Sequence, residues 1–119
     1  MSQALRRILA DISRVEGVKG VIVVSKDGLV LDAVVPSKDV NTEEIAAAVS
    51  QIVNVAGKLG ADFDLGNTDI ITLEYANGRV MVGDIGENFI LVVADKTALV
   101  GMIRNEIKRQ RDKIKAIVG

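Results

Sequence analysis

The chain contains no cysteine, no histidine and no tryptophan among its 119 residues. Without cysteine it can form no disulfide, no thiolate metal site and no cysteine nucleophile. Without histidine it also lacks the commonest general base and the commonest metal ligand of proteins. The serine and threonine hydroxyls therefore have no imidazole to activate them for covalent catalysis.

Aromatic residues and proline are also scarce, with two phenylalanines, one tyrosine and one proline. Apolar residues nevertheless make up 49% of the chain and charged residues 26%, which excludes a disordered or fibrous protein. The core must then be built from valine, isoleucine, leucine and alanine. This length predicts a single domain over residues 1–119.

Long hydrophobic runs are missing as well. No apolar segment approaches the length that crosses a bilayer. Met1 is followed by Ser-Gln-Ala-Leu-Arg-Arg, with no apolar signal-peptide region behind the arginines. We therefore expect a cytoplasmic protein without a transmembrane segment.

The net charge of −1 is unevenly distributed along the chain. Residues 96–119 carry seven basic and two acidic side chains, whereas the remainder carries eight basic and fourteen acidic ones. A basic tail of this kind can bind nucleic acid or anionic lipid. A solvated cationic helix face is the simpler explanation, because the tail has no aromatic residues for base stacking. We therefore expect no nucleic-acid binding.

Helical periodicity predicts three helices. Residues 5–15 place apolar side chains at i, i+3, i+4 and i+7. A second helix begins at the capping sequence Asn41-Thr42-Glu43-Glu44 and is expected to end at Gly60. The third begins at Lys96-Thr97 and keeps helical spacing nearly to the last residue.

Five short apolar runs predict strands, at residues 21–24, 29–35, 68–75, 79–84 and 88–94. Turn dipeptides such as Asp27-Gly28 and Asn77-Gly78 join neighbouring runs. The expected order is α-β-β-α-β-β-β-α, and strands joined by tight turns predict a mainly antiparallel sheet of the α+β class. The runs VIVV and FILVVA are apolar on both faces, so helices should cover both sides of the sheet.

The predicted central helix is apolar over an unusually wide part of its surface. Its polar stripe is narrow, with Glu43, Ser50, Asn54 and Lys58. One sheet face cannot cover the rest, so the helix should contact a second partner. The following strand is long and free of proline, and such an edge invites pairing. We therefore predict a dimer.

Patterns typical of enzymes and cofactor sites are incomplete. Gly57-Lys58 lacks both the upstream glycine and the following hydroxyl residue of a phosphate-binding loop. The acidic stretch 61–69 resembles a calcium loop, but Gly66 comes one position early and Glu74 one position late. Arg79 could reach a partner's phosphate as an arginine finger, although an exposed edge residue is the simpler interpretation. We expect no enzyme activity, no metal and no cofactor.

The segment from Leu5 through GVKGVIVVSKDGLVLD resembles the opening of the Roadblock/dynein light chain family, in which a helix leads into a G-V-x-G hairpin with a polar D-G turn. The resemblance continues over nearly the whole chain. It includes the alanine-rich central helix, the segments ITLEYANGRVMV and FILVVAD, and the final helix. It implies a profilin-like or longin-like sheet of five antiparallel strands. The central helix would lie on one face and the two terminal helices on the other.

Members of this family usually form homodimers or heterodimers whose third strands pair edge to edge and whose central helices lie side by side. Together with the wide apolar helix, the resemblance places the dimer interface on the central helix and the third strand. The expected interface residues are Ala48, Val49, Ile52, Val53, Ala56, Ile70, Ile71, Thr72 and Leu73.

Family members serve as platforms for Ras-like small GTPases, and MglB-like prokaryotic stand-alone members regulate a polarity GTPase. This short chain is nearer to those members than to the dynein subunits. The resemblance therefore implies a non-enzymatic scaffold or regulator of a Ras-like GTPase, with activation and anchoring both open. The expected contacts with the GTPase are Ser50, Gln51, Asn54 and Lys58.

Two alternative functions stay open at this point. One is a small-molecule sensor on a profilin-like sheet, although the strands offer almost no buried polar residue except Thr72 and Asn88. The other is a module whose basic tail binds membrane or nucleic acid.

Overall fold

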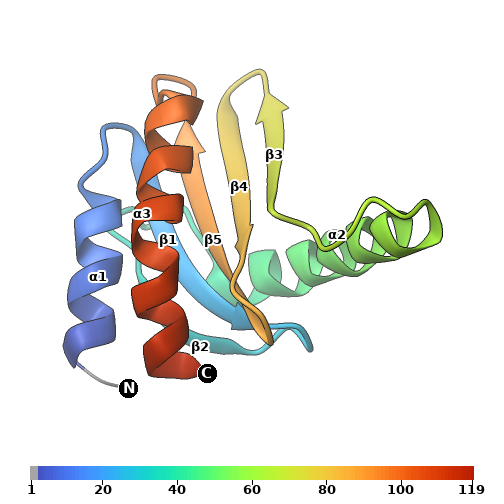
Figure 1. Ribbon diagram of the computed structural model, residues 1–119. Coiled ribbons are helices and arrows are strands. Elements are labelled where there is room, and N and C mark those ends of the chain that lie inside the picture. The colour runs from blue at the N-terminus through green and yellow to red at the C-terminus, as the bar shows by residue number, and fades with distance from the viewer. Residues whose placement is uncertain (1–2) are drawn as a thin grey trace.

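The computed structural model describes residues 3–119 and shows one antiparallel sheet between two layers of helix (Figure 1). The elements in chain order are α1 (Gln3–Ser13), β1 (Val18–Ser25), β2 (Val30–Val34), α2 (Thr42–Asp62), β3 (Ile70–Tyr75), β4 (Gly78–Asp84), β5 (Asn88–Asp95) and α3 (Val100–Val118). This is the order predicted from the sequence, and the α+β class is confirmed.

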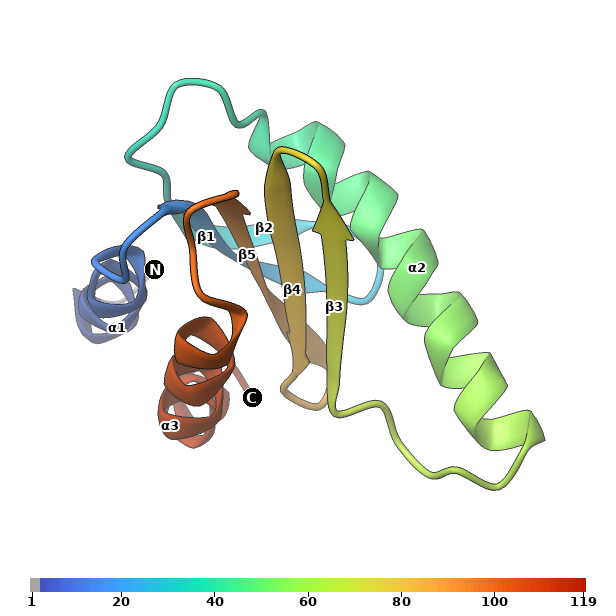
Figure 2. The ribbon, with the colours of Figure 1, turned by 90° about the horizontal axis from the view of Figure 1, so that it is seen from above.

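The five strands lie in the order β2-β1-β5-β4-β3, and every neighbouring pair is antiparallel. In Figure 2, α1 and α3 lie on one side of the sheet and α2 on the other. The layers are therefore those that the family resemblance implied. β2 and β3 form the two edges of the sheet.

Each face of the sheet has its own core. On the α1 and α3 side, Val21 and Val92 of the central strands pack with Leu5 and Ile107 of the helices. On the α2 side the alternate strand residues are buried, together with three helix residues: Ile22, Val24, Phe89, Leu91, Ala46, Val49 and Val53. Because side chains alternate along a strand, two covered faces require apolar residues at every position. This explains the continuous runs VIVV and FILVVA.

The polar SKDG stretch forms the β1–β2 turn. Gly28 has φ +90°, a left-handed conformation that favours glycine, and its N–H donates to the Ser25 carbonyl at 2.9 Å. The Ser25 hydroxyl accepts from the Leu29 N–H at 3.1 Å. These backbone and hydroxyl groups bond within the turn itself, so their role is to form the hairpin.

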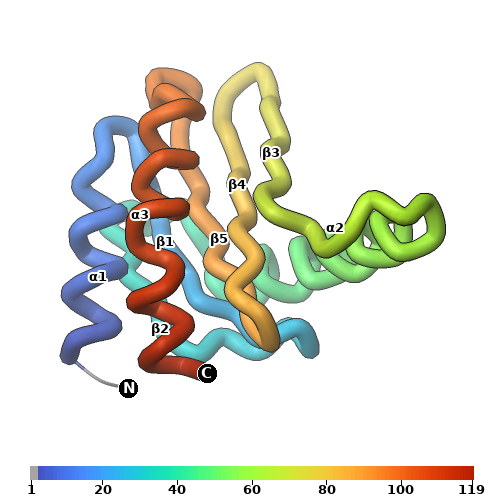
Figure 3. The backbone as a smooth tube through the Cα atoms, in the orientation of Figure 1, coloured from blue at the N-terminus to red at the C-terminus, as the bar shows by residue number. Residues whose placement is uncertain are grey.

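Two predicted helix boundaries are wrong. Gly60 lies inside α2, which ends at Asp62, and the left-handed residue after the helix is Asp64, with φ 54°. α3 starts at Val100 instead of Lys96, because the Asp95 carboxylate accepts from the Thr97 N–H at 2.8 Å and holds a turn there. Figure 3 shows the loop after α2 running back to the start of β3.

Candidate protein–protein interface

Only one side of α2 packs on the sheet. Ala46, Val49 and Val53 are buried against β1, β2 and their neighbours. The C-terminal half of the helix projects beyond the sheet on the side of β3 (Figure 1). A large part of its surface therefore has no cover from its own chain.

The uncovered side of α2 carries a row of apolar side chains, which we call the α2 stripe. It consists of Ala48, Ile52, Val55, Leu59 and Phe63. The spacing of three or four residues puts them on one face of the helix. Val55 is 70% exposed, Leu59 55% and Phe63 68%. A contiguous apolar row of this kind is typical of an interaction surface.

Next to the α2 stripe lies the unpaired edge of β3. The Asp84 N–H donates to the Asp69 carbonyl at 3.0 Å, so this pair belongs to the hydrogen-bonded positions of the β3–β4 ladder. In an antiparallel ladder these positions alternate. Ile71 and Leu73 therefore bond to β4, whereas the backbone groups of Ile70 and Thr72 point to the free edge. No proline blocks this edge.

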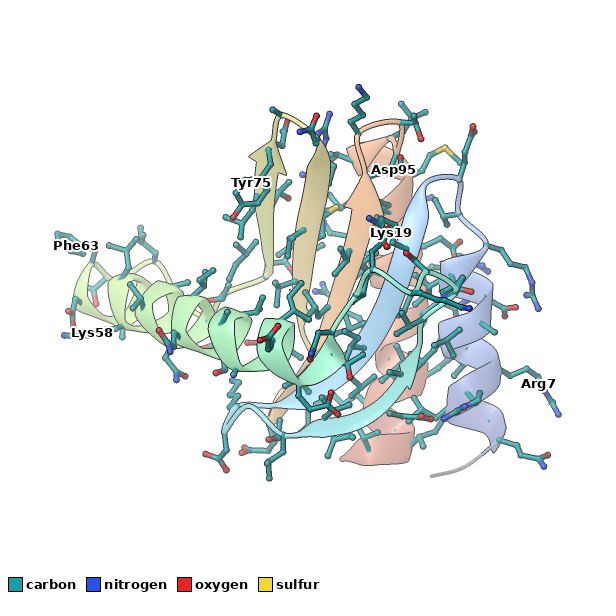
Figure 4. The ribbon with its side chains drawn as sticks, turned by 180° about the vertical axis from the view of Figure 1, so that it is seen from behind. Arg7, Lys19, Lys58, Phe63, Tyr75 and Asp95 are labelled. Carbon is teal, nitrogen blue, oxygen red and sulfur yellow. The ribbon has the colours of Figure 1, made fainter. Side chains whose placement is uncertain are left out.

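The side chains of β3 alternate between the two faces of the sheet. Ile71 packs with the core on the α2 side and Ile70 with the core on the α3 side. Tyr75 follows Ile71 at even spacing on the α2 side and is 58% exposed. In Figure 4, Tyr75 lies on β3, and Phe63 and Lys58 lie at the far end of α2. The α2 stripe and the edge of β3 thus border the same side of the molecule.

The structure changes the expected set of interface residues. Ala48 is exposed and Ile52 and Ala56 are half-buried, so these three are accessible. Val49 and Val53 belong to the chain's own core, and this part of the expectation is corrected. Since the apolar positions of α2 form one wide continuous face, its periodicity could not show which part of that face meets the sheet. The expected residues of β3 are half-buried at the edge: Ile70, Ile71, Thr72 and Leu73.

Of the four residues expected to contact the GTPase, three are exposed and one is buried. Gln51, Asn54 and Lys58 are exposed, and the Lys58 ammonium pairs with Asp62 at 2.7 Å. Ser50 is only 9% exposed, and its hydroxyl donates to the Ala47 carbonyl at 2.8 Å. It faces Gly28 of the β1–β2 turn, where the helix crosses the hairpin. Ser50 is therefore removed from the expected contact surface.

A cleft of about 490 Å³ lies below the C-terminal half of α2. Its walls include Lys26, Asn54, Asp84 and Glu87, and Lys26 pairs with Asp84 at 3.6 Å. Ligand pockets usually have mostly apolar walls with a few polar groups. The charged, glycine-rich walls of this cleft do not match that description, and the sensor alternative gains no support from it.

The remaining candidate residues have local partners. Arg79 donates from Nη1 to the carbonyls of Tyr75 and Gly78, both at 2.9 Å, and so holds the β3–β4 turn. Arg111 and Lys108 lower the pKa of the Asp69 carboxyl, mainly through the hydrogen bond from Arg111. Within residues 3–119, no three acidic side chains come together as metal ligands would. No helix in the same range is long and apolar enough to span a membrane.

Comparison with known proteins gives a consistent result. The family profile described as Roadblock/LC7 domain matches residues 5–95. The uncharacterised protein MJ0310 of Methanocaldococcus jannaschii is 34% identical over 93% of this chain and 96% of its own. MglB of Myxococcus xanthus superposes with a TM-score of 0.88 at 18% identity, over 97% of this chain and 94% of that chain. A Roadblock/LC7 domain from Streptomyces avermitilis does so with a TM-score of 0.84 at 19% identity, covering 94% and 95%.

Proposed function

The chain belongs to the Roadblock/LC7 domain family, and on this premise we propose that it forms a dimer that serves as a non-catalytic scaffold or regulator of a Ras-like small GTPase. The observation that carries the proposal is the exposed α2 stripe beside the unpaired edge of β3. Each feature alone invites a partner, and a second chain of the same kind covers both at once.

The dimer follows from a two-fold axis beside β3. Two copies of β3 pair antiparallel and form one continuous sheet of ten strands, in which each copy offers the same backbone groups. The two α2 helices then lie on one face of that sheet, with their α2 stripes against each other. The α1 and α3 helices of both copies lie on the opposite face. The second chain is either an identical copy or another Roadblock-like chain.

The GTPase-binding surface lies on the α2 face. Gln51, Asn54 and Lys58 are exposed and flank the apolar seam, which suits a reversible interface with a polar rim. The chain supplies no histidine base, and the guanidinium of Arg79 is bound to its own turn. The regulator would therefore act by ordering the switch loops of the GTPase.

The test uses the tagged protein to capture binding partners from a lysate of its own cells. The lysate contains either a non-hydrolysable GTP analogue or GDP. We expect a Ras-like GTPase among the captured proteins, more with one nucleotide than with the other. The purified GTPase should then bind at least tenfold more weakly to a variant with Asn54→Arg and Lys58→Glu. Light scattering must show that this variant is still a dimer.

A control carries Arg104→Glu and Lys115→Glu on the opposite face, a larger change in net charge than that of the α2 variant, and it should bind the GTPase like the wild type. Truncating the basic helix would be a poorer control, because Ile114 is fully buried. Equal GTPase binding by the α2 variant, or no captured GTPase with either nucleotide, would refute the proposal.

A further inference from the structure

Positive charge is concentrated in the two terminal segments of the chain. Residues 1–16 and 96–119, which contain α1 and α3, hold ten basic and four acidic side chains. Residues 17–95 hold five basic and twelve acidic ones. Figure 1 shows α1 and α3 side by side on one face, so the excess positive charge is gathered there.

Much of that charge follows one side of α3, which we call the basic stripe. It consists of Arg104, Lys108, Arg111 and Lys115, whose spacing of three or four residues lines them up along the helix. Arg111 Nη1 lies 2.5 Å and Lys108 Nζ 3.7 Å from the Asp69 carboxylate, just before β3. The Lys115 side chain lies beside Gly86 in the β4–β5 turn. The basic stripe therefore faces the free edge of the sheet.

Most of the charge in the basic stripe is not compensated. Asp69 is the one acid that pairs with the stripe among residues 3–119, and it is shared by Lys108 and Arg111. Arg104 and Lys115 have no ion pair in the same range. Asp84 and Asp112 lie in the same hollow as Arg111 and Lys115 without pairing with them, so the four cations leave an excess of positive charge along this wall.

The position of α3 leaves room beside the wall. α3 packs over β4 and β5, where Gly83 lies directly under Ile107, and β3 extends beyond it to the edge. In the proposed dimer, β3 and its copy lie between the two α3 helices. If each α3 axis lies midway between β4 and β5, it is two strand spacings from the two-fold axis. With strands about 4.8 Å apart, the two α3 axes are then separated by about 19 Å. Packed helices lie about 8–10 Å apart, so this groove has the width of one additional helix.

We propose that this groove binds an acidic amphipathic helix of a partner protein. The inference rests on the proposed dimer, because one chain alone supplies only one wall. The walls are the two basic stripes. The floor is formed by the half-buried side chains of Ile70 and Thr72 from both copies of β3, and the exposed Glu74 follows them on the same face of the strand.

The composition of the groove favours a helix over nucleic acid or membrane. Neither the stripe nor the α3-side floor carries an aromatic residue on which a base could stack. The outermost line of α3 carries Asn105, Asp112 and Ala116, so the cations lie on its flank and do not form a flat basic surface. A helix with leucines on one side and glutamates on the other matches a floor with Ile70 at its centre and cationic walls on both sides.

The probe is a fluorescein-labelled 18-residue peptide with leucine at i, i+3, i+4 and i+7 spacing and glutamate elsewhere. A scrambled peptide of the same composition controls for charge alone. Binding is measured by fluorescence anisotropy at low and moderate salt, and light scattering gives the mass of the complex. We expect one amphipathic peptide per two chains, with at least tenfold weaker binding of the scrambled peptide.

The variant Arg104→Glu with Lys115→Glu should weaken peptide binding at least tenfold. The matched control Arg7→Glu with Lys38→Glu makes the same change in net charge at exposed cations outside the groove, and it should bind within about twofold of the wild type.

Equal loss with both variants, equal binding of both peptides, or preference for a dT oligonucleotide or phosphatidylserine vesicles would overturn the proposal. A dimer that binds no peptide refutes the groove alone. A monomer refutes the dimer on which both proposals rest.

Discussion

The carbonyl oxygen of Gly66 lies directly against Gly60, so close that a Cβ at Gly60 would be 2.5 Å from it. The Leu65 N–H also donates to the Gly60 carbonyl at 2.8 Å. These contacts fold the loop after α2 back under the last turns of the helix. They therefore fix where β3 begins relative to the α2 stripe.

Replacing Gly60 by alanine should destabilise the protein by about 1–3 kcal/mol, because the new methyl group would displace the Gly66 backbone. Gly57→Ala in the same helix is the matched control. Its Cβ would meet no atom within 4 Å, so alanine there should stabilise the helix by up to about 1 kcal/mol. Urea denaturation of both variants at one protein concentration tests the pair. Equal effects would show that the loop does not pack on Gly60.

A charge in the α2 stripe should separate the dimer. Val55→Glu places a carboxylate where the proposed partner covers an apolar side chain, which costs several kcal/mol if the carboxylate stays unpaired. We expect light scattering to give a dimer for the wild type at micromolar concentration and a folded monomer for Val55→Glu. Leu29→Glu, at a similarly exposed leucine in the β1–β2 turn, should stay dimeric. A wild-type monomer would contradict the proposed interface directly.

Proline substitutions can distinguish the two edges of β3, the one that bonds to β4 and the one that is free. Thr72→Pro removes an N–H that points to the free edge, so it should weaken dimerisation while the circular dichroism spectrum stays native. Ile71→Pro removes an N–H that bonds to β4, so it should lower the melting temperature of the fold itself. The reverse pattern would mean that the outward positions are assigned to the wrong residues.

The pKa of the Asp69 carboxyl should lie below its ordinary value, with the hydrogen bond from Arg111 as the main cause. A pKa that is lower in the folded chain contributes stability above the ordinary value, and this contribution is lost as pH falls through the folded value. Asp69→Asn should therefore destabilise the protein at neutral pH and progressively less in acid.

Carboxyl NMR titration can measure this pKa directly. Arg111→Gln should return it towards the ordinary value, whereas Arg104→Gln on the same side of α3 should leave it nearly unchanged. An Asp69 carboxyl that titrates normally in the wild type would show that the ion pair does not form in solution.

Most of the fold was predictable because its signals are local. Asp27-Gly28 specifies a hairpin turn, and the two-sided apolar run FILVVA predicts a strand with a helix layer on each face. The end of α2 was not predictable in the same way. In the sequence, Gly60 is a strong signal for the end of a helix. In the folded chain a glycine is needed there because the Gly66 backbone leaves no room for a Cβ, and this contact cannot be read from the sequence.

The candidate interface was predictable as a surface but less so residue by residue. A helix with so wide an apolar face predicts two partners without showing which part of the face meets which partner. Val49 and Val55 are equivalent in hydrophobicity, yet one is 3% exposed and the other 70%. The direction in which α2 crosses the β1–β2 hairpin decides between them, and that direction depends on packing between distant segments.

The free edge of β3 also bears on how a chain would choose its partner. Its hydrogen-bonding groups belong to the backbone and are the same in every polypeptide, so they can bind without discriminating. Recognition between like and unlike copies is then left to the few side chains of the α2 stripe. A cell that makes several such chains would form mixed pairs in proportion to their abundance, unless substitutions at positions such as Val55 or Leu59 set the chains apart.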